Sequence, residues 1–276
     1  MIRMGKVLAG RVVVITGGAR GIGATTAAAL VREGARVAIG DVDRDAAEAT
    51  ATRLGALALP LDVTDLPGFT RFLDEVEQRL GPIDVLINNA GVMLLSPFEE
   101  EDDAATTRQL EINVHAVLHG TREAIKRMRP RARGHIVNVA SMAGKSGFPG
   151  AATYCATKHA VVGLSEAVRH ELRGSGVDIS CVMPVIVRTD LAGGLADMKL
   201  FPQLRAEDVA TAIVEALKQP RFDVFVPRSL DLTTRVARLV PREVAEWFLR
   251  FVGADRVFSR ARSDARAEYE AKVQKS

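Results

Sequence analysis

The segment Arg11-Val-Val-Val-Ile-Thr-Gly-Gly-Ala-Arg-Gly-Ile-Gly23 joins an apolar run directly to a glycine-rich turn. The run Arg11–Ile15 predicts a buried strand, and Ile22–Glu33 predicts the helix that follows it. Glycines at 17, 21 and 23 allow a tight turn and a close approach of the backbone to a pyrophosphate, whose charge the helix N-terminus stabilises. A strand, a glycine-rich turn and a helix in this order indicate a dinucleotide site.

The spacing of these glycines is GxxxGxG, which differs from the more familiar GxGxxG. The turn also lacks the GK[ST] ending of a nucleoside-triphosphate loop. A turn with a purely structural role is the alternative interpretation.

The rest of the chain alternates strand-like runs with helical segments, which predicts a parallel sheet with helices on both faces. Several strands are continuous apolar runs, as expected when both faces of a sheet are buried. The predicted strands are Arg11–Ile15, Arg36–Ile39, Ala56–Leu61, Val85–Asn88, His135–Val139, Asp178–Val182 and Val224–Val226. The predicted helices are Ile22–Glu33, Arg44–Leu54, Pro67–Leu80, Asp103–Met128, Ala152–Gly174 and Ala206–Lys218.

Composition narrows the function classes. The chain has 276 residues, of which 47% are hydrophobic and 26% charged, a profile that fits one large globular α/β domain. The 37 basic and 34 acidic residues leave a net charge of only +3, so no nucleic-acid footprint stands out. The two cysteines, Cys155 and Cys181, are expected to be buried thiols in a reducing compartment. No signal peptide or membrane-spanning run is recognised, and we expect a cytoplasmic protein.

An acidic residue follows the second predicted strand, about twenty positions beyond the glycines. Asp41 is placed to accept hydrogen bonds from both hydroxyls of an adenosine ribose, and its charge would repel a 2′-phosphate. The sequence therefore predicts NAD over NADP. Arg20 favours the opposite, because a cation in the glycine turn can meet a 2′-phosphate, unless it serves a salt bridge or a diphosphate contact. A helix N-cap role for Asp41 or Asp43 is the competing interpretation.

Polar and small residues follow the third and fourth predicted strands, whose carboxyl ends face the cofactor crevice of such a sheet. Asp62 is placed to accept from an adenine amino group. The pair Asn88–Asn89 is suited to bridge neighbouring strands, beside the small residues Ala90 and Gly91. An Asx cap and a turn are the alternatives.

Asn113 lies in the middle of a predicted helix, where asparagine is a poor helix former. We expect it to have a carbonyl or water partner at a small kink. His115 and His119 share a helix face nearby, but no carboxylate or cysteine accompanies them at ligand spacing, so we assign no metal.

Tyr154 and Lys158 are spaced i, i+4 in Gly150–His159, GAATYCATKH, so a helix brings the ammonium beside the phenol. A free phenol has a pKa of about 10, and a nearby cation is expected to lower that pKa towards the range a general acid or base needs. Ser141 follows the fifth strand on the same rim. Taken alone, a half-buried tyrosine beside a solvated lysine, and an N-cap serine, are the simpler interpretations.

Pro184 redirects the chain after the sixth strand, and Thr189 is suited to hold a small polar group such as a carboxamide. The Gly- and Leu/Met-rich stretch Asp190–Pro202 predicts a mobile lid over an apolar site.

In this order, the glycine turn, Asn88–Gly91, Asn113, Ser141 and Tyr154/Lys158 resemble the short-chain dehydrogenases/reductases over about residues 8–227. The resemblance implies a doubly wound, Rossmann-like parallel sheet of seven strands in the order 3-2-1-4-5-6-7, NAD(P) binding, and dimers or tetramers that pack through the helices of Asn113 and Tyr154. It implies a catalytic tetrad of Asn113, Ser141, Tyr154 and Lys158. It implies cofactor contacts from Thr16, Gly17, Arg20, Gly21, Ile22, Gly23, Asp41, Asp62, Val63, Asn89, Ala90, Gly91, Tyr154, Lys158, Val187 and Thr189.

One departure from the family pattern is that Val185 stands where a glycine usually follows Pro184, so the nicotinamide-side loop is expected to differ in shape. In the implied mechanism Tyr154 exchanges a proton with the substrate oxygen and Ser141 hydrogen-bonds that oxygen. Lys158 lowers the tyrosine pKa and holds the nicotinamide ribose, and Asn113 positions a water that links Lys158 to solvent.

We expect residues 1–228 to form the catalytic domain and residues 229–276 to form a helical extension. An apolar helical face is predicted in the extension, and a charged tail is expected to be a solvated or frayed helix from Ser259 to Ser276. The face has three candidate uses: capping the substrate cleft, pairing with a subunit, or lying on a membrane surface. Its residues are Val244, Trp247, Phe248, Phe251 and Val252, opposite Arg242, Glu243, Glu246 and Arg250.

The leading functional hypothesis is an NAD(P)-dependent alcohol/ketone oxidoreductase with a bulky apolar substrate, resembling family members that act on retinoids, steroids or other lipid-like alcohols. A non-catalytic dinucleotide sensor or scaffold is the alternative, and the intact Ser/Tyr/Lys set speaks against it. An epimerase or dehydratase would have a different glycine spacing and a larger C-terminal domain.

Overall fold

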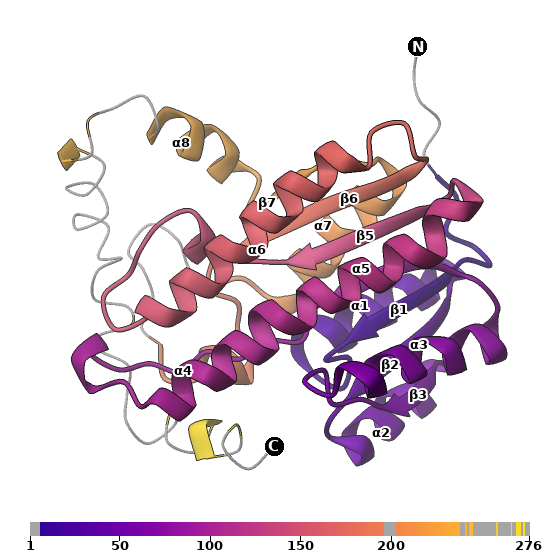
Figure 1. Ribbon diagram of the computed structural model, residues 1–276, viewed down its shortest axis with the longest axis horizontal. Helices are drawn as coiled ribbons and strands as arrows, with labels where there is room; N and C mark the ends of the chain where they lie inside the picture. The colour runs from indigo at the N-terminus through magenta and orange to yellow at the C-terminus, as the bar shows by residue number, and fades with distance from the viewer. Residues whose placement is uncertain are drawn as a thin grey trace.

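Seven parallel strands form one sheet in the order β3-β2-β1-β4-β5-β6-β7 (Figure 1). The computed structural model describes residues 6–195, 203–237, 241, 243–244, 258, 266, 269–271 and 273. The sheet order is the one that the family resemblance implies, and the strand ends differ from those predicted from the sequence by a residue or two. The strands are β1 (Val12–Thr16), β2 (Arg36–Asp41), β3 (Leu57–Pro60), β4 (Ile83–Asn88), β5 (Gly134–Val139), β6 (Val177–Pro184) and β7 (Asp223–Val226).

Helices cover both faces of the sheet, and each face buries its own apolar cluster. Helices α1, α2 and α7 pack on one face, while α3, α5 and α6 pack on the other, which is nearer the viewer in Figure 1. The α-helices are α1 (Gly21–Arg32), α2 (Arg44–Leu54), α3 (Leu66–Leu80), α4 (Asp103–Leu110), α5 (Ala116–Met128), α6 (Ala152–Glu171), α7 (Ala206–Lys218) and α8 (Ser229–Ala237).

The strand order reverses at β1, which pairs with β2 on one side and β4 on the other. In open parallel sheets the crevice outside the carboxyl strand ends at such a point is where ligands bind. Thr16 ends β1 opposite Gly40 of β2, and Asn88 ends β4 opposite Asn138 of β5. The topology therefore brings the glycine turn and the Asn88–Gly91 segment to one edge.

The helix predicted over Asp103–Met128 is interrupted by a turn of π-helix at Glu111–His115. Asn113, at the centre of this turn, is fully buried and binds the main chain of Val92 through both side-chain atoms. Single π turns often mark functional positions in helices. The predicted carbonyl partner of Asn113 is present and belongs to Val92, in the loop after β4.

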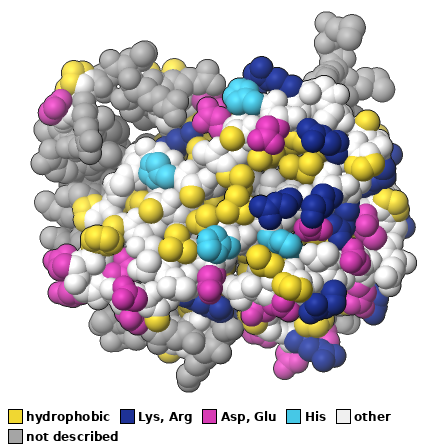
Figure 2. Space-filling model, in the orientation of Figure 1, with side chains coloured by type: hydrophobic (Ala, Val, Ile, Leu, Met, Phe, Trp, Pro, Cys, Tyr) yellow, Lys and Arg dark blue, Asp and Glu magenta, His cyan; other side chains and the backbone are white. Residues whose placement is uncertain are grey.

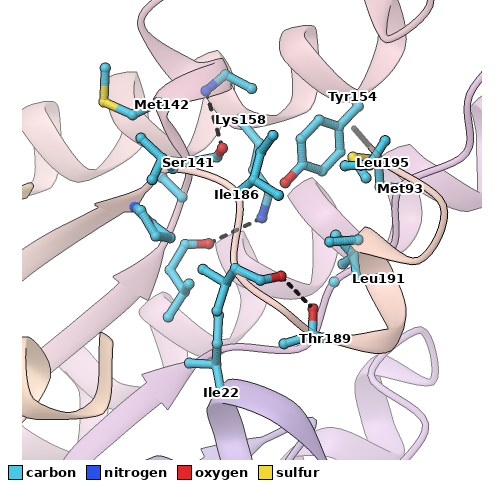
Figure 3. A pocket seen from close by; sticks show the side chains of 18 of the residues that line it. Ile22, Met93, Ser141, Met142, Tyr154, Lys158, Ile186, Thr189, Leu191 and Leu195 are labelled. Atoms are coloured by element: carbon cyan, nitrogen blue, oxygen red, sulfur yellow. Dashed lines mark hydrogen bonds between the residues drawn. The ribbon is translucent and has the colours of Figure 1, made fainter. Parts of the chain in front are cut away.

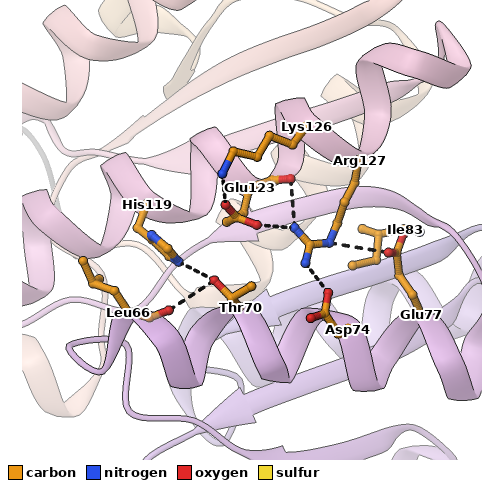
Figure 4. A network of polar contacts seen from close by, with 9 residues as sticks. All are labelled: Leu66, Thr70, Asp74, Glu77, Ile83, His119, Glu123, Lys126 and Arg127. Carbon is orange, nitrogen blue, oxygen red and sulfur yellow. Dashed lines mark hydrogen bonds and ion pairs between the residues drawn. The ribbon is translucent and has the colours of Figure 1, made fainter.

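A polar network joins α3 to α5 on the outer side of the molecule (Figure 4). Arg127, only 13% exposed, pairs with Glu123 on its own helix and with Asp74 and Glu77 on α3. His119 contacts the Thr70 hydroxyl at 3.0 Å, so this histidine packs between helices. No group of His, Cys, Asp or Glu in the described part of the chain is arranged to hold a metal ion.

The outer face of α5 and α6 carries a band of hydrophobic side chains with charged residues at its borders (Figure 2). None of the helices that can be described combines the length and the apolarity that crossing a bilayer takes.

The charged end of the chain is buried at some of the positions that can be described, although Ala271 is exposed. Phe258, Arg266 and Val273 are each less than 10% exposed. The expectation of a solvated or frayed segment after Ser259 is therefore wrong for Arg266 and Val273, and Arg266 is held by hydrogen bonds to the distant carbonyls of Leu191 and Met93. Trp247, Phe248, Phe251, Val252, Arg242, Glu246 and Arg250 of the predicted amphipathic face lie outside the described residues, and Val244 is exposed.

Candidate active site

The glycine turn after β1 forms a cradle that side chains would fill. Gly17 and Gly21 have positive φ angles of 65° and 52°, which glycine adopts without strain. A Cβ atom on Gly17 would lie 2.9 Å from the Cα of Ala90, and one on Gly23 would lie 2.1 Å from the Gly17 carbonyl oxygen. These positions therefore require glycine, and the open backbone next to the N-terminus of α1 fits a pyrophosphate.

Asn89 fastens the end of β4 to the glycine turn. Its side-chain nitrogen donates to the carbonyl oxygens of Thr16 and Gly17, each at 2.9 Å. The Thr16 hydroxyl in turn accepts from the main-chain nitrogens of Asn89 and Ala90, each at 3.0 Å. The turn is thus held in place by hydrogen bonds of the chain itself.

Asp41 ends β2 and Arg20 is the N-cap residue of α1, so both lie beside this turn. One carboxylate oxygen of Asp41 accepts from the Ala19 nitrogen at 3.0 Å, and the other accepts from the Asp43 nitrogen at 3.1 Å. Arg20 forms an ion pair with Asp43, which also caps α2 through the Ala46 nitrogen. Of the two aspartates weighed as caps, Asp43 is the one that caps α2, and Arg20 has a carboxylate partner.

Asp62 follows β3 and accepts from the nitrogen and the hydroxyl of Thr64, at 2.9 and 2.7 Å. Its carboxylate therefore forms an Asx-type turn at an exposed position, while neighbouring Val63 is buried.

Thr189 closes the other side of the cradle. A Cβ on Gly21 would lie 3.1 Å from the methyl carbon of Thr189. The Thr189 hydroxyl donates to the Val187 carbonyl at 3.3 Å (Figure 3). Val185, at the departure from the family pattern, donates its main-chain nitrogen to Val226 at 3.1 Å. In the described chain Ala132 is the non-glycine residue with a positive φ, so the backbone at Val185 is ordinary. The loop takes this path without a glycine.

Ser141, Tyr154 and Lys158 line one pocket at the carboxyl edge of the sheet (Figure 3). Tyr154 and Lys158 share a face of α6, and Lys158 Nζ lies 5.7 Å from the centroid of the tyrosine ring. The ammonium donates to the Val139 carbonyl at the end of β5, at 3.1 Å. Ser141 caps the short helix η4 (Met142–Gly144) by accepting from the Ala143 nitrogen at 3.1 Å.

The electrostatics of this pair differ from the sequence-based expectation. Burial raises the pKa of Tyr154, and a hydrogen bond with Ser141 partly offsets this effect. Burial lowers the pKa of Lys158 to about 8. The net direction of the tyrosine shift is thus opposite to the expected one, because loss of hydration is its largest cause.

Asn113 lies behind the pair. Its oxygen accepts from the Val92 nitrogen at 2.9 Å, and its nitrogen donates to the Val92 carbonyl at 2.8 Å and to the Thr157 hydroxyl at 3.2 Å. A Cβ on Gly91 would lie 3.2 Å from the Asn113 oxygen and 3.6 Å from Lys158 Nζ. The structure thus brings Asn113, Lys158 and the segment after β4 together.

Asn88 bridges the neighbouring strands β4 and β5, as the sequence predicts, but sequence reasoning missed the buried residues Asn138 and Ser165 that continue this polar chain. Asn88 donates to Asn138 at 2.8 Å, and Asn138 donates to Ser165 of α6 at 3.0 Å. It also missed Gln109, fully buried in α4, which accepts from the Leu94 nitrogen at 3.2 Å. An amide within an apolar run, as at Asn138 in His135–Val139, was the available signal.

Apart from these polar groups the pocket has an apolar lining. The side chains come from the loop after β4, from η4 and its surroundings, from the segment after β6, and from the C-terminal part of the chain. The apolar lining residues are Ile22, Met93, Met142, Phe148, Val185, Ile186, Leu191, Leu195 and Phe258.

Comparison with known proteins assigns the family. Residues 11–200 match the short chain dehydrogenase family. Sorbitol dehydrogenase of Cereibacter sphaeroides is 41% identical over 183 residues, which cover 65% of this chain and 72% of that protein. Estradiol 17-beta-dehydrogenase 11 of Mus musculus is 31% identical over 244 residues, 86% of this chain and 82% of that one.

Two further comparisons concern a longer protein and a solved structure. The chain spans only 18% of glycine betaine reductase ATRR of Emericella nidulans, with 34% identity over 227 residues, 77% of this chain. The crystal structure of a short chain dehydrogenase/reductase from Burkholderia phymatum in complex with NAD superposes with a TM-score of 0.77 at 29% identity, covering 84% of this chain and 94% of that one.

A doubly wound sheet with a glycine cradle beside a Ser/Tyr/Lys pocket defines a dinucleotide-dependent oxidoreductase. The chain belongs to the short-chain dehydrogenase/reductase family, and it is an oxidoreductase that acts on CH–OH groups with NAD(P).

Proposed function

We propose that this enzyme transfers hydride between NAD and a bulky, apolar secondary alcohol or ketone, with Tyr154 as the general acid and base. The observation that carries the proposal is the position of the Tyr154 phenol, in a pocket whose other walls are mostly apolar side chains. The polar side chains available to a substrate oxygen in this pocket include Ser141, Tyr154 and Lys158, which are the groups that the proposed reaction uses.

In this proposal Tyr154 donates its proton to the carbonyl oxygen during reduction and accepts the proton from the hydroxyl during oxidation. Its raised pKa keeps it in the acid form. Ser141 hydrogen-bonds the same oxygen and orients the carbon for hydride transfer. A positioned general acid or base of this kind contributes roughly 10²- to 10⁴-fold to a rate.

Lys158 has two roles in the proposal. It holds a ribose hydroxyl of the cofactor, and its charge favours the phenolate when the proton leaves Tyr154. Asn113 is a positioning residue: by holding both main-chain groups of Val92 it fixes the segment beside Lys158. We also propose that Asn113 supports a water that connects Lys158 to solvent.

The residues proposed to hold the cofactor fit it well. The glycine cradle would hold the pyrophosphate, Asp41 would bind the ribose hydroxyls, and Asp62 and Val63 would bind the adenine. When bound, the nicotinamide supplies or accepts the hydride. The remaining proposed contacts come from Thr16, Gly17, Arg20, Gly21, Ile22, Gly23, Asn89, Ala90, Gly91, Tyr154, Lys158, Val187 and Thr189.

NAD is the proposed cofactor because the Asp41 carboxylate repels a 2′-phosphate, while Arg20 is engaged by Asp43. A solved relative was crystallised with NAD, which agrees with this preference.

The relatives' names suggest two classes of substrate, polyols and steroids, and the apolar lining of the pocket favours one of them. Sorbitol has a hydroxyl on every carbon, whereas estradiol is a large, mostly apolar steroid. Met93, Phe148, Leu191 and Phe258 offer a polyol no hydrogen-bond partners through their side chains. Burying an apolar ring system against them is favourable at about 25 cal/mol per Å². We therefore propose the apolar class.

We also propose a homodimer or homotetramer that pairs through the hydrophobic band over α5 and α6 (Figure 2). Residues 1–228 form the proposed catalytic unit and residues 229–276 an extension that caps the substrate pocket. The protein is proposed to act in the cytoplasm, and contact of the extension with a membrane surface is the alternative use.

The test is an initial-rate survey of nicotinamide absorbance with NAD or NADP and secondary alcohols that range from small and polar to steroid-sized. We expect the highest kcat/KM with NAD and a large apolar alcohol. Efficient turnover confined to polyols, or a preference for NADP, would overturn the substrate or the cofactor part of the proposal.

A further inference from the structure

Arg266 reaches from the C-terminal part of the chain into the rim of the substrate pocket. Its side chain is 5% exposed. One terminal nitrogen donates to the Leu191 carbonyl at 2.7 Å, the other donates to the Met93 carbonyl, and Nε donates to Glu270 at 3.0 Å. All three nitrogens of the planar guanidinium are thus used, in a fork that lysine lacks.

The two carbonyls belong to separate walls of the pocket. Met93 lies in the loop after β4, and Leu191 lies in the short helix η5 (Asp190–Ala192) after β6. Both residues line the pocket with Ser141 and Tyr154. Nearly one hundred residues separate Met93 from Leu191 in the sequence. By binding both carbonyls, Arg266 fixes the distance between these two walls, which local structure does not set.

Two aromatic side chains from the same end of the chain support the link. The Met93 nitrogen donates to the Tyr269 hydroxyl at 3.2 Å, and the Arg266 guanidinium carbon lies 4.9 Å from the centroid of the Tyr269 ring. Phe258 lines the pocket, with its ring centroid 5.2 Å from that of Phe148. Both the carbonyl and the amide of Met93 are therefore held by C-terminal residues.

We propose that Arg266 is a positioning residue that clamps the Met93 and Leu191 walls together and so makes the pocket select large apolar substrates. This inference rests on the proposed function. Apolar side chains bind a large substrate well only when they are held against it, because a gap between the two surfaces weakens their dispersion attraction. A small alcohol reaches Tyr154 and Ser141 without using these walls.

The charge of Arg266 also reaches the reacting phenol. The groups that act on Tyr154 are Ser141 after β5, Cys155 on α6, and Tyr269 and Arg266 from the C-terminal part. Lys158 lies 5.7 Å from the ring centroid. Arg266 lowers the pKa of Tyr154, whereas burial and Tyr269 raise it. Loss of the cation is therefore expected to move the tyrosine pKa upward.

Two variants separate the clamp from the charge. In Arg266→Met both are lost, and kcat/KM for a steroid-sized alcohol is expected to fall about tenfold, mainly through KM, while a small secondary alcohol changes less than about twofold. Arg266→Lys keeps the charge and loses the fork, so the same KM effect is expected in both variants if the fork is what holds the two carbonyls.

A measurement without substrate tests the clamp independently. Hydrogen exchange is expected to speed up at the Met93 amide and around Leu191 in Arg266→Met, compared with the wild type. The matched control is Arg127→Met, which removes another well-buried arginine from the α3–α5 network (Figure 4). This control is expected to lower the melting temperature without altering exchange near Met93 or the ratio of kcat/KM values.

The outcomes separate the inference from the proposed function. Unchanged selectivity and unchanged exchange at Met93 in Arg266→Met would overturn the clamp, whatever the substrate. A wild-type enzyme that turns over no alcohol would contradict the proposed function, and the exchange experiment would still decide the clamp. Equal losses for large and small alcohols would also overturn it, since a role in selectivity requires them to differ.

Discussion

Lys158 Nζ lies 5.7 Å from the centroid of the Tyr154 ring and donates a 3.1 Å hydrogen bond to the Val139 carbonyl. The end of β5 therefore fixes the ammonium at one side of the phenol without a direct hydrogen bond between the two side chains. Both groups are buried, which lowers the pKa of Lys158 to about 8 and raises that of Tyr154. Each shift favours the neutral form of its side chain. A change in the charges near the site therefore alters the protonation of both groups.

This pKa predicts a pH dependence of cofactor binding. Lys158 is protonated below pH 8 and loses its charge as the pH rises through about 8. If it holds the cofactor ribose, the dissociation constant for NAD is expected to increase by roughly three- to tenfold over that interval, because a charge-assisted hydrogen bond weakens. Lys158→Arg keeps its charge and is expected to show a flat profile by calorimetry. Parallel profiles for the two proteins would argue against this role.

Cofactor choice is expected to depend on the charge of Asp41. Asp41→Asn has nearly the same shape and keeps an oxygen acceptor for the Ala19 or Asp43 nitrogen, but removes the repulsion of a 2′-phosphate. We expect the ratio of kcat/KM for NADP to that for NAD to rise by about tenfold or more, since one unit charge at a partly exposed site contributes about 1–2 kcal/mol. Initial rates with both cofactors measure it. An unchanged ratio would place the ribose away from Asp41.

Acid destabilisation is predicted from His135 in β5. Burial lowers its pKa from 6.5 to about 4. The unfolded chain therefore binds more protons between those values, so the free energy of unfolding decreases as the pH falls from 6.5 towards 4, by about 3 kcal/mol. Urea denaturation at pH 7 and pH 4.5 measures this difference.

His135→Gln is expected to lose stability at both pH values but to show a smaller difference between them than the wild type. His170→Gln, at an exposed position of α6, serves as the control and is expected to retain the wild-type difference. The prediction fails if His135→Gln keeps that difference too.

The same glycine-to-alanine substitution is expected to change the free energy of unfolding in opposite directions at two helix positions. A Cβ on Gly120 of α5 would lie 2.4 Å from the Asn88 side-chain oxygen, whereas one on Gly163 of α6 meets nothing within 4 Å. Gly120→Ala is expected to reduce the free energy of unfolding by about 1–3 kcal/mol, because it pushes α5 away from β4. Gly163→Ala is expected to increase it by roughly 0.5–1 kcal/mol through helix propensity. Chemical denaturation compares them, and equal effects would refute the close approach.

Local patterns predicted a parallel sheet with helices on both faces, because apolar runs, glycine turns and helix periods recur in a regular alternation, whereas the strand order came from the family resemblance. They also anticipated a partner for Asn113, since an amide inside an apolar helix needs one. They did not reveal that the partner is Val92 or that the helix forms a π turn there, because both depend on a loop distant in sequence.

The sequence predicted the wrong direction for the pKa of Tyr154 and did not predict the burial of Arg266. Both features depend on contacts between residues that are distant in the sequence. The spacing of Tyr154 and Lys158 gives their proximity, but burial comes from Met93, Leu191 and other residues that no local window contains. Arg266 lies in a run of charged residues that is typical of a solvated tail, yet it contacts carbonyls 75 and 173 positions away.

The most direct test of the central claim is hydride transfer by Tyr154→Phe, measured as kcat/KM with NAD and the best apolar secondary alcohol, alongside NAD affinity. The account predicts a loss of roughly 10²- to 10⁴-fold in kcat/KM with NAD affinity changed less than about twofold, because only the proton donor is removed. A variant that retains kcat/KM within about threefold of the wild type would contradict the assignment of Tyr154 as the general acid and base.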